Sequence, residues 1–82
     1  MTTKYQLDLL LPPAEQQAIV TRAIAADSLR RAAHDAWLDP CRGSLDRLSA
    51  TTKYARSVGV SERDLDLLED QGIREAIRGE ED

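Results

Sequence analysis

His34 is the only histidine of this 82-residue chain, and Cys41, which follows it closely, is the only cysteine. A cysteine whose thiol gives its proton to a nearby histidine is the nucleophile of many enzymes. Such a site also needs a group that orients the histidine and donors that stabilise an oxyanion, and the sequence supplies no evident candidate for either. We therefore expect an ordinary surface histidine and predict no enzymatic activity.

The sequence also lacks the patterns that hold metals and phosphates. A single cysteine cannot form an intrachain disulfide or a zinc site built from several cysteines. The carboxylates of Asp64, Asp66, Glu69 and Asp70 spread around one predicted helix and do not form the alternating ligands of a calcium loop. The four glycines stand singly, so no glycine-rich phosphate loop occurs. We predict no metal and no cofactor.

The most informative spacing lies in residues 51–70, TTKYARSVGVSERDLDLLED. With Thr51 as the first position, Ala55 falls fifth and Gly59 ninth, and apolar residues occupy five further positions of a known pattern: Tyr54, Val58, Val60, Leu65 and Leu68. The stretch resembles the helix-turn-helix motif family over about a quarter of the chain. In that family a small residue lets two helices cross closely, and a glycine permits the left-handed turn between them.

The second helix of this motif carries the wrong charge for DNA. The resemblance implies that its groove-facing positions are Ser61, Glu62, Arg63, Asp66, Leu67 and Asp70. Three acids and one base give this face a net charge of −2. An acidic face cannot neutralise phosphates, so it does not release the counterions whose release drives binding to a polyanion. Only Arg63 is of a type that commonly reads base edges. A DNA-binding function is therefore the less favoured interpretation.

The charge of the whole chain is uneven in the same sense. Residues 1–60 hold eight basic and six acidic residues, net +2, whereas residues 61–82 hold three basic and nine acidic ones, net −6; the sum is −4. An acidic C-terminal quarter suits a basic protein partner or serves solubility alone. Leu67, an apolar side chain among charges, has the pattern of an interface anchor. The alternative is that the chain around Ile73 and Ile77 folds back and covers it.

Residues 1–12 predict a short extended arm, because Tyr5, Leu7, Leu9 and Leu11 alternate with polar residues before a double proline. No second strand-like segment accompanies the arm. It must therefore pack on its own helices, pair with a second copy to make a homodimer, or add to the sheet of a partner. The predicted partner-binding residues are thus Glu62, Arg63, Asp66, Leu67 and Asp70 on the acidic helix and Tyr5, Leu7 and Leu9 on the arm.

Residues 14–38 predict one long helix, with Pro13 in its first turn. Its apolar face is expected to comprise Ala18, Ile19, Ala25, Leu29, Ala32, Ala33, Ala36 and Trp37, with Trp37 as the core anchor. A turn at 39–43 leads to a second helix that Ser44 caps and that ends before Gly59; its inward residues are expected to be Leu45, Leu48, Ala55 and Val58. Ser61 caps a third helix that runs to about residue 71, where Gly72 interrupts it. A short terminal helix around Ile73 and Ile77 and a frayed acidic tail, 79–82, complete the chain.

The expected fold is a single all-α domain spanning residues 1–82, a small helical bundle with a thin core, since the chain has three aromatic residues. The expected function is that of a small non-enzymatic regulator or adaptor, which binds and modulates a protein with a basic surface through the acidic helical face. The alternative is a helix-turn-helix transcriptional regulator that binds DNA as a dimer. The lone cysteine, the lack of an apolar run long enough for a membrane and the lack of a signal-peptide pattern predict a cytoplasmic location.

Overall fold

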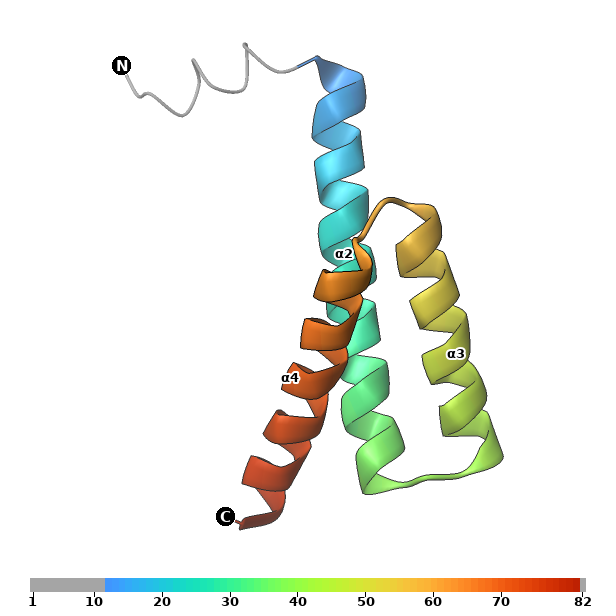
Figure 1. Cartoon of the computed structure of the whole chain (residues 1–82), viewed down its shortest axis with the longest axis vertical. Helices are drawn as coiled ribbons and strands as arrows, with labels where there is room; N and C mark the ends of the chain where they lie inside the picture. The colour runs from blue at the N-terminus through green and yellow to red at the C-terminus, as the bar shows by residue number, and fades with distance from the viewer. Residues whose placement is uncertain (1–11, 82) are drawn as a thin grey trace.

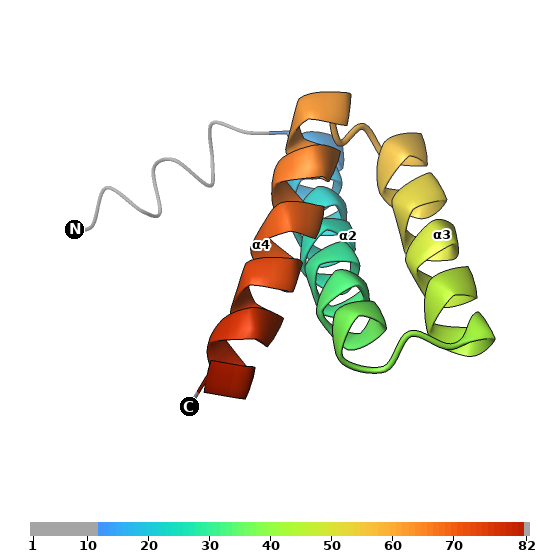
Figure 2. The ribbon, with the colours of Figure 1, turned by 60° about the horizontal axis from the view of Figure 1, so that its bottom comes forward.

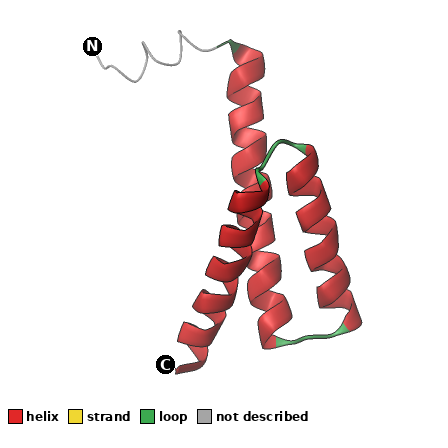
Figure 3. Cartoon of the chain, in the orientation of Figure 1, coloured by secondary structure: helices red, strands yellow, loops and turns green. Residues whose placement is uncertain are grey.

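The computed structural model describes residues 12–81, and within this range the chain forms three α-helices and no strand (Figure 3). They are α2 (Pro13–Leu38), α3 (Arg42–Ser57) and α4 (Glu62–Glu81). The prediction of an all-α fold with one long first helix is confirmed. The predicted arm, including Tyr5, Leu7 and Leu9, lies outside the described residues.

Helix α2 is the central element, and the other two helices pack along it (Figure 1). The chain descends through α2, returns through α3 and descends again through α4, so α4 runs in the same direction as α2. After rotation of the molecule, α3 and α4 still flank α2 and touch each other little (Figure 2). The first turns of α2 extend beyond both neighbours (Figure 1). The burial pattern is consistent with this arrangement, because the first buried residue of α2 is Ala25.

The helix starts differ in part from the predicted ones. Pro13 occupies the first turn of α2, as predicted, where a missing N–H has no consequence. Helix α3 begins at Arg42, three residues before the start predicted from a cap at Ser44, and Cys41 is its N-cap. Ser44 acts from inside the first turn: its Oγ accepts a hydrogen bond from the Cys41 backbone N–H (3.0 Å) and donates one to the Asp39 carbonyl (2.7 Å). The prediction that Ser44 is the N-cap is wrong, because Cys41 holds that position and Ser44 contributes from the third residue of the helix.

The turn between α3 and α4 has the predicted chemistry. Gly59 has a φ of 101°, in the left-handed region that favours glycine. Its N–H bonds the Arg56 carbonyl (3.2 Å), and the Val60 N–H bonds the Ala55 carbonyl (3.0 Å), which together form a Schellman motif. Ser61 then caps α4 through its Oγ, which accepts from the Asp64 N–H (3.2 Å).

Gly72 does not interrupt α4, and this prediction is wrong. The helix continues through it to Glu81, so there is no separate terminal helix, and residues 79–81 are helical where a frayed tail was expected. A Cβ at position 72 would lie 2.2 Å from the carbonyl oxygen of Arg30 and 3.0 Å from the Cβ of Ala33. Glycine is required here because the backbones of α2 and α4 approach too closely for a side chain.

The core is built mainly from alanine. The buried apolar residues of the described chain are Ala25, Leu29, Ala32, Ala33, Ala36, Ala55, Leu65 and Ala76, and partly buried Leu48, Val58, Val60 and Leu68 pack around them. Leu29 is the one large side chain among the described residues that is fully buried. Such a core lets helices lie close together but removes little apolar surface from water.

Three of the predicted core positions are wrong: Trp37, Ile19 and Leu45 are each about half exposed. Trp37 lies at the edge of the alanine stripe of α2, and helices this close leave no room between them for an indole. Ile19 belongs to the first turns of α2, which extend beyond the neighbouring helices. Tyr54, the fourth position of the helix-turn-helix spacing, is also exposed, whereas Ala55 and Leu65 are buried.

Candidate functional site

The five residues predicted on the acidic helix all lie on the exposed side of α4: Glu62, Arg63, Asp66, Leu67 and Asp70. Leu67 is 56% exposed. The alternative in which the chain end folds back over Leu67 is wrong, because Ile73 and Ile77 continue the same helix and are themselves partly buried. An apolar side chain therefore remains in water among charged neighbours.

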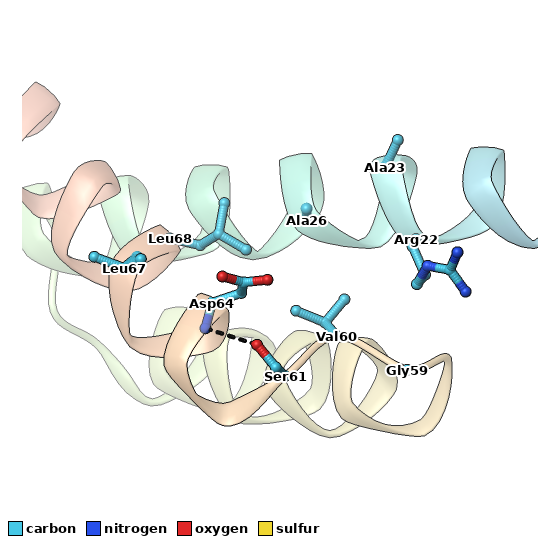
Figure 4. Close-up of a pocket in the computed structure, with 9 residues that line it drawn as sticks. All are labelled: Arg22, Ala23, Ala26, Gly59, Val60, Ser61, Asp64, Leu67 and Leu68. Carbon is cyan, nitrogen blue, oxygen red and sulfur yellow. Dashed lines mark hydrogen bonds between the residues drawn. The ribbon is translucent and has the colours of Figure 1, made fainter.

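Leu67 also borders an open groove between α2 and the first turns of α4, with a volume of about 470 Å³ (Figure 4). Ala23 and Ala26 form the α2 side, and Val60, Leu67 and Leu68 form the opposite side. The polar lining residues are Arg22, Ser61 and Asp64. A mostly apolar groove with a few polar groups at its margin is the usual shape of a site that receives an apolar side chain or helix.

Sequence reasoning did not find the α2 side of this groove. Arg22, Ala23 and Ala26 precede the acidic helix by about forty residues, and they reach it because α4 runs alongside α2. The aliphatic part of Arg22 passes close to Gly59, where its Cδ would lie 3.6 Å from an added Cβ. Only the parallel packing of the two helices, which no local pattern encodes, brings these residues together.

The charges on α4 divide into paired and unpaired groups. Glu62 receives two hydrogen bonds from Arg56 (2.5 and 3.2 Å), and Asp70 pairs with Arg74 (2.7 Å). Within the described part of the chain, Asp66 and Glu69 have no ion pair, and with Asp70 and Ile73 they line a shallow hollow of about 230 Å³. The hollow and the groove share no lining residue, so the free carboxylates of Asp66 and Glu69 lie along a different side of α4 from the groove.

The ion pairs predict how stability depends on pH. Hydrogen bonds and charge from Arg56 lower the pKa of Glu62 below its ordinary value of 4.5. A hydrogen bond from Arg30 and the charges of Arg31 and Arg30 lower the pKa of Asp27 below 3.8. A carboxylate with a lowered folded-state pKa stabilises the fold above its unfolded pKa, and the contribution is lost as pH falls through the folded value. We expect the melting temperature, followed by circular dichroism, to fall below about pH 4.5.

Glu62→Gln should make this acid-side decline shallower, by a small amount because the pair is exposed. Glu15→Gln is the matched control, since Glu15 is exposed and has no ion pair among the described residues. An unchanged acid-side slope in Glu62→Gln would show that the Arg56 pair adds nothing to stability.

The residues considered for catalysis have other partners. Nδ1 of His34 lies 3.2 Å from Asp35, and Cys41 interacts with Ser44, whose hydroxyl and backbone N–H lower the pKa of the exposed thiol. No hydrogen bond joins His34 to Cys41 within residues 12–81. The same described region contains no cluster of three His, Cys, Asp or Glu residues able to hold a metal.

His34 and Asp35 belong to a second, polar groove of about 370 Å³ that crosses all three helices. Arg30 bonds both Asp27 (2.7 Å) and Glu75, and Arg47 bonds Asp35 (3.1 Å). Each of these arginines is matched by an acid, so this groove offers little unbalanced charge to a ligand. Its charges join α3 and α4 to α2.

The described residues define a small three-helix bundle with a mostly apolar groove that has Asp64 at its margin. No protein-family model, curated protein or solved structure matches the chain. Across the described residues, no helix has the length and apolar character needed to span a membrane.

Proposed function

We propose that this chain is a non-enzymatic regulator or adaptor that binds another protein through the face of α4 bearing Glu62, Arg63, Asp66, Leu67 and Asp70. The observation that carries the proposal is Leu67, which is 56% exposed at the margin of an apolar groove. Isolated apolar residues are common on protein surfaces, but one that continues into a groove is typical of an interface.

The chemistry of this face favours a helix or loop with an apolar side chain beside basic ones. The apolar side chain would enter between Ala26 and Leu68, where it would be removed from water. Basic side chains would meet Asp64 at the margin of the groove and Asp66 beside Leu67, which lack ionic partners among the described residues. Complementary charge of this kind mainly speeds association and selects the partner, while the apolar contact supplies most of the affinity.

Leu67→Glu tests the proposal. We expect it to lower recovery of the protein partner at least about tenfold when the tagged chain is purified from the cells that make it, because a hot-spot side chain contributes about 2 kcal/mol or more. Leu45→Glu is the matched control: Leu45 is similarly exposed, but on α3. Equal recovery of the same proteins by both variants and the original chain would exclude this face as the binding site.

Nuclease treatment and a gel shift separate this proposal from the DNA-binding alternative. We expect partner recovery to survive nuclease and duplex DNA to be left unshifted even at low salt. Sequence-selective binding that weakens steeply with salt would overturn the proposal, because that slope reports phosphate contacts.

A further inference from the structure

The groove beside Leu67 is continued along α2 toward the N-terminal end of the helix. Ala23 and Ala26 form its α2 side, and Ile19 lies one turn before Ala23 on the same side of the helix. Ile19 is 47% exposed. These three residues form an apolar stripe that runs from the groove to the first turns of α2, and therefore toward the segment that precedes Pro12.

That segment has the composition of an occupant for the groove. Residues 4–11, the apolar part of the predicted arm, precede the described part of the chain and have the sequence KYQLDLLL. In an extended conformation, Tyr5, Leu7, Leu9 and Leu11 would all project from one side. We propose that residues 4–11 fold back along α2 and occupy the groove of the same chain, with Tyr5 between the α2 side and the α4 side.

The length of the segment fits this placement. From Pro13 to Ala26 an α-helix rises about 20 Å, at about 1.5 Å per residue. An extended chain covers about 3.3 Å per residue, so Leu10 to Lys4 also span about 20 Å. Leu11 and Pro12 then remain for the reversal of direction. Tyr5 comes level with the part of α2 that lines the groove.

The charges fit in type and in order. Arg22 and Asp64 line the groove, and neither has an ion pair within the described residues. Arg22 lies at the end nearer the N-terminus of α2, and Asp64 lies further along, beside Leu68 (Figure 4). The segment carries one acid, Asp8, and one base, Lys4. A segment that runs antiparallel to α2 from its tether brings Asp8 to Arg22 first. The same direction then brings Lys4 to Asp64.

The segment would also control access to the groove, a consequence that rests on the proposed function. Tyr5 next to Lys4 offers an aromatic side chain beside a basic one, which is the chemistry inferred above for the partner. A segment tethered to its site has an effective concentration on the order of millimolar, so even a weak contact keeps it in place for much of the time. The segment and the protein partner therefore compete for the same groove.

Disulfide trapping within the full chain tests the placement. In a Cys41→Ser background, Leu7→Cys with Ala23→Cys should form an intramolecular disulfide at least about tenfold faster than Leu7→Cys with Ile24→Cys. Ala23 and Ile24 are adjacent and both exposed, but only Ala23 lines the groove. Equal rates would overturn the placement. A disulfide that forms between chains, at a rate that rises with protein concentration, would overturn it as well, because the segment would then occupy a second copy.

A charge exchange tests the direction of the segment. Asp8→Arg or Arg22→Asp alone should slow trapping at Ala23 about two- to fivefold, the range for an exposed ion pair, and the two together should restore it. Asp8→Arg with Lys53→Asp is the matched control, since Lys53 is also exposed but lies on α3. Equal rescue by both combinations would show that Asp8 does not meet Arg22.

Partner recovery tests the competition. Tyr5→Ala should raise recovery of the protein partner at least about threefold, because the apparent affinity of a site falls with the fraction of time that it is free. Gln6→Ala is the matched control: an extended segment that turns Tyr5 into the groove turns Gln6 away from it. It should leave recovery unchanged.

Leu67→Glu separates a failure of this inference from a failure of the proposed function. If Leu67→Glu lowers partner recovery but Tyr5→Ala leaves it unchanged, the partner binds this face and the segment does not compete for it. If neither variant changes recovery while the disulfide still forms preferentially at Ala23, the proposed function fails and the placement of residues 4–11 stands.

Discussion

Gly72→Ala should destabilise the fold by about 1–3 kcal/mol, although it replaces the poorest helix former short of proline with the best one. The added methyl group would lie 2.2 Å from the carbonyl oxygen of Arg30, which belongs to the backbone of α2. A backbone atom cannot rotate away, so α2 and α4 must separate. Separation loosens Ala33 and Ala76, which are buried. Urea unfolding followed by circular dichroism at fixed protein concentration measures the change.

Gly79→Ala is the matched control, because Gly79 lies in the same helix with nothing within 4 Å of an added Cβ. Helix propensity alone then acts, and we expect stabilisation by up to about 1 kcal/mol. The two substitutions are chemically identical and should have opposite signs. If Gly72→Ala also stabilises the chain, the close approach of α2 and α4 at this point is incorrect.

The helix boundaries were largely predictable because they depend on local chemistry. Pro13 is compatible with the first turn of a helix, Gly59 supplies a positive φ, and Ser61 caps the helix that follows. The prediction for Gly72 is wrong because a glycine inside a helical pattern can have two structural roles: it can break the helix, or it can allow another backbone to approach. Only the position of Arg30, about forty residues earlier in the sequence, decides between them.

The core was harder to predict than the helices. A helical wheel places Trp37 beside Ala33 and Ala36, and the larger side chain is then expected to dominate the burial. In the structure the alanines bring the helices so close together that Trp37 and Ile19 remain at the margin. The wheel identifies the side of a helix that packs, but not the distance to the neighbouring helix or how far along the helix the neighbour extends.

The exposed side of α4 was predicted residue by residue, because exposure on a helix follows from periodicity and charge. Glu62, Asp66, Leu67 and Asp70 are exposed as expected. The groove beside Leu67 was not predicted, since nothing in the sequence around Ala23 and Ala26 distinguishes them from other alanines of a long helix. Their place in a surface depends on the parallel alignment of α2 with α4, which is set by Gly72 and the alanines and not by any local motif.

Leu29→Ala should destabilise the chain by about 2–5 kcal/mol, the range for removing a fully buried leucine. Leu29 is 0% exposed and packs with Ala25, Ala55 and Leu65, so it contacts residues from all three helices. Neighbouring alanines cannot extend into the cavity, and the backbones that carry them are already close. Because native stability is commonly about 5–15 kcal/mol, we expect this variant to be partly unfolded near room temperature.

Leu38→Ala provides the comparison, since Leu38 is 45% exposed at the end of the same helix. Its effect should stay within about 0.5 kcal/mol, as for most surface substitutions. Both variants lose the same atoms, and the difference between their free energies of unfolding measures burial alone. A difference below about 1 kcal/mol would mean that Leu29 is not the centre of the core. In that case the stability of the chain would have to come mainly from contacts outside this core, such as the proposed partner on α4.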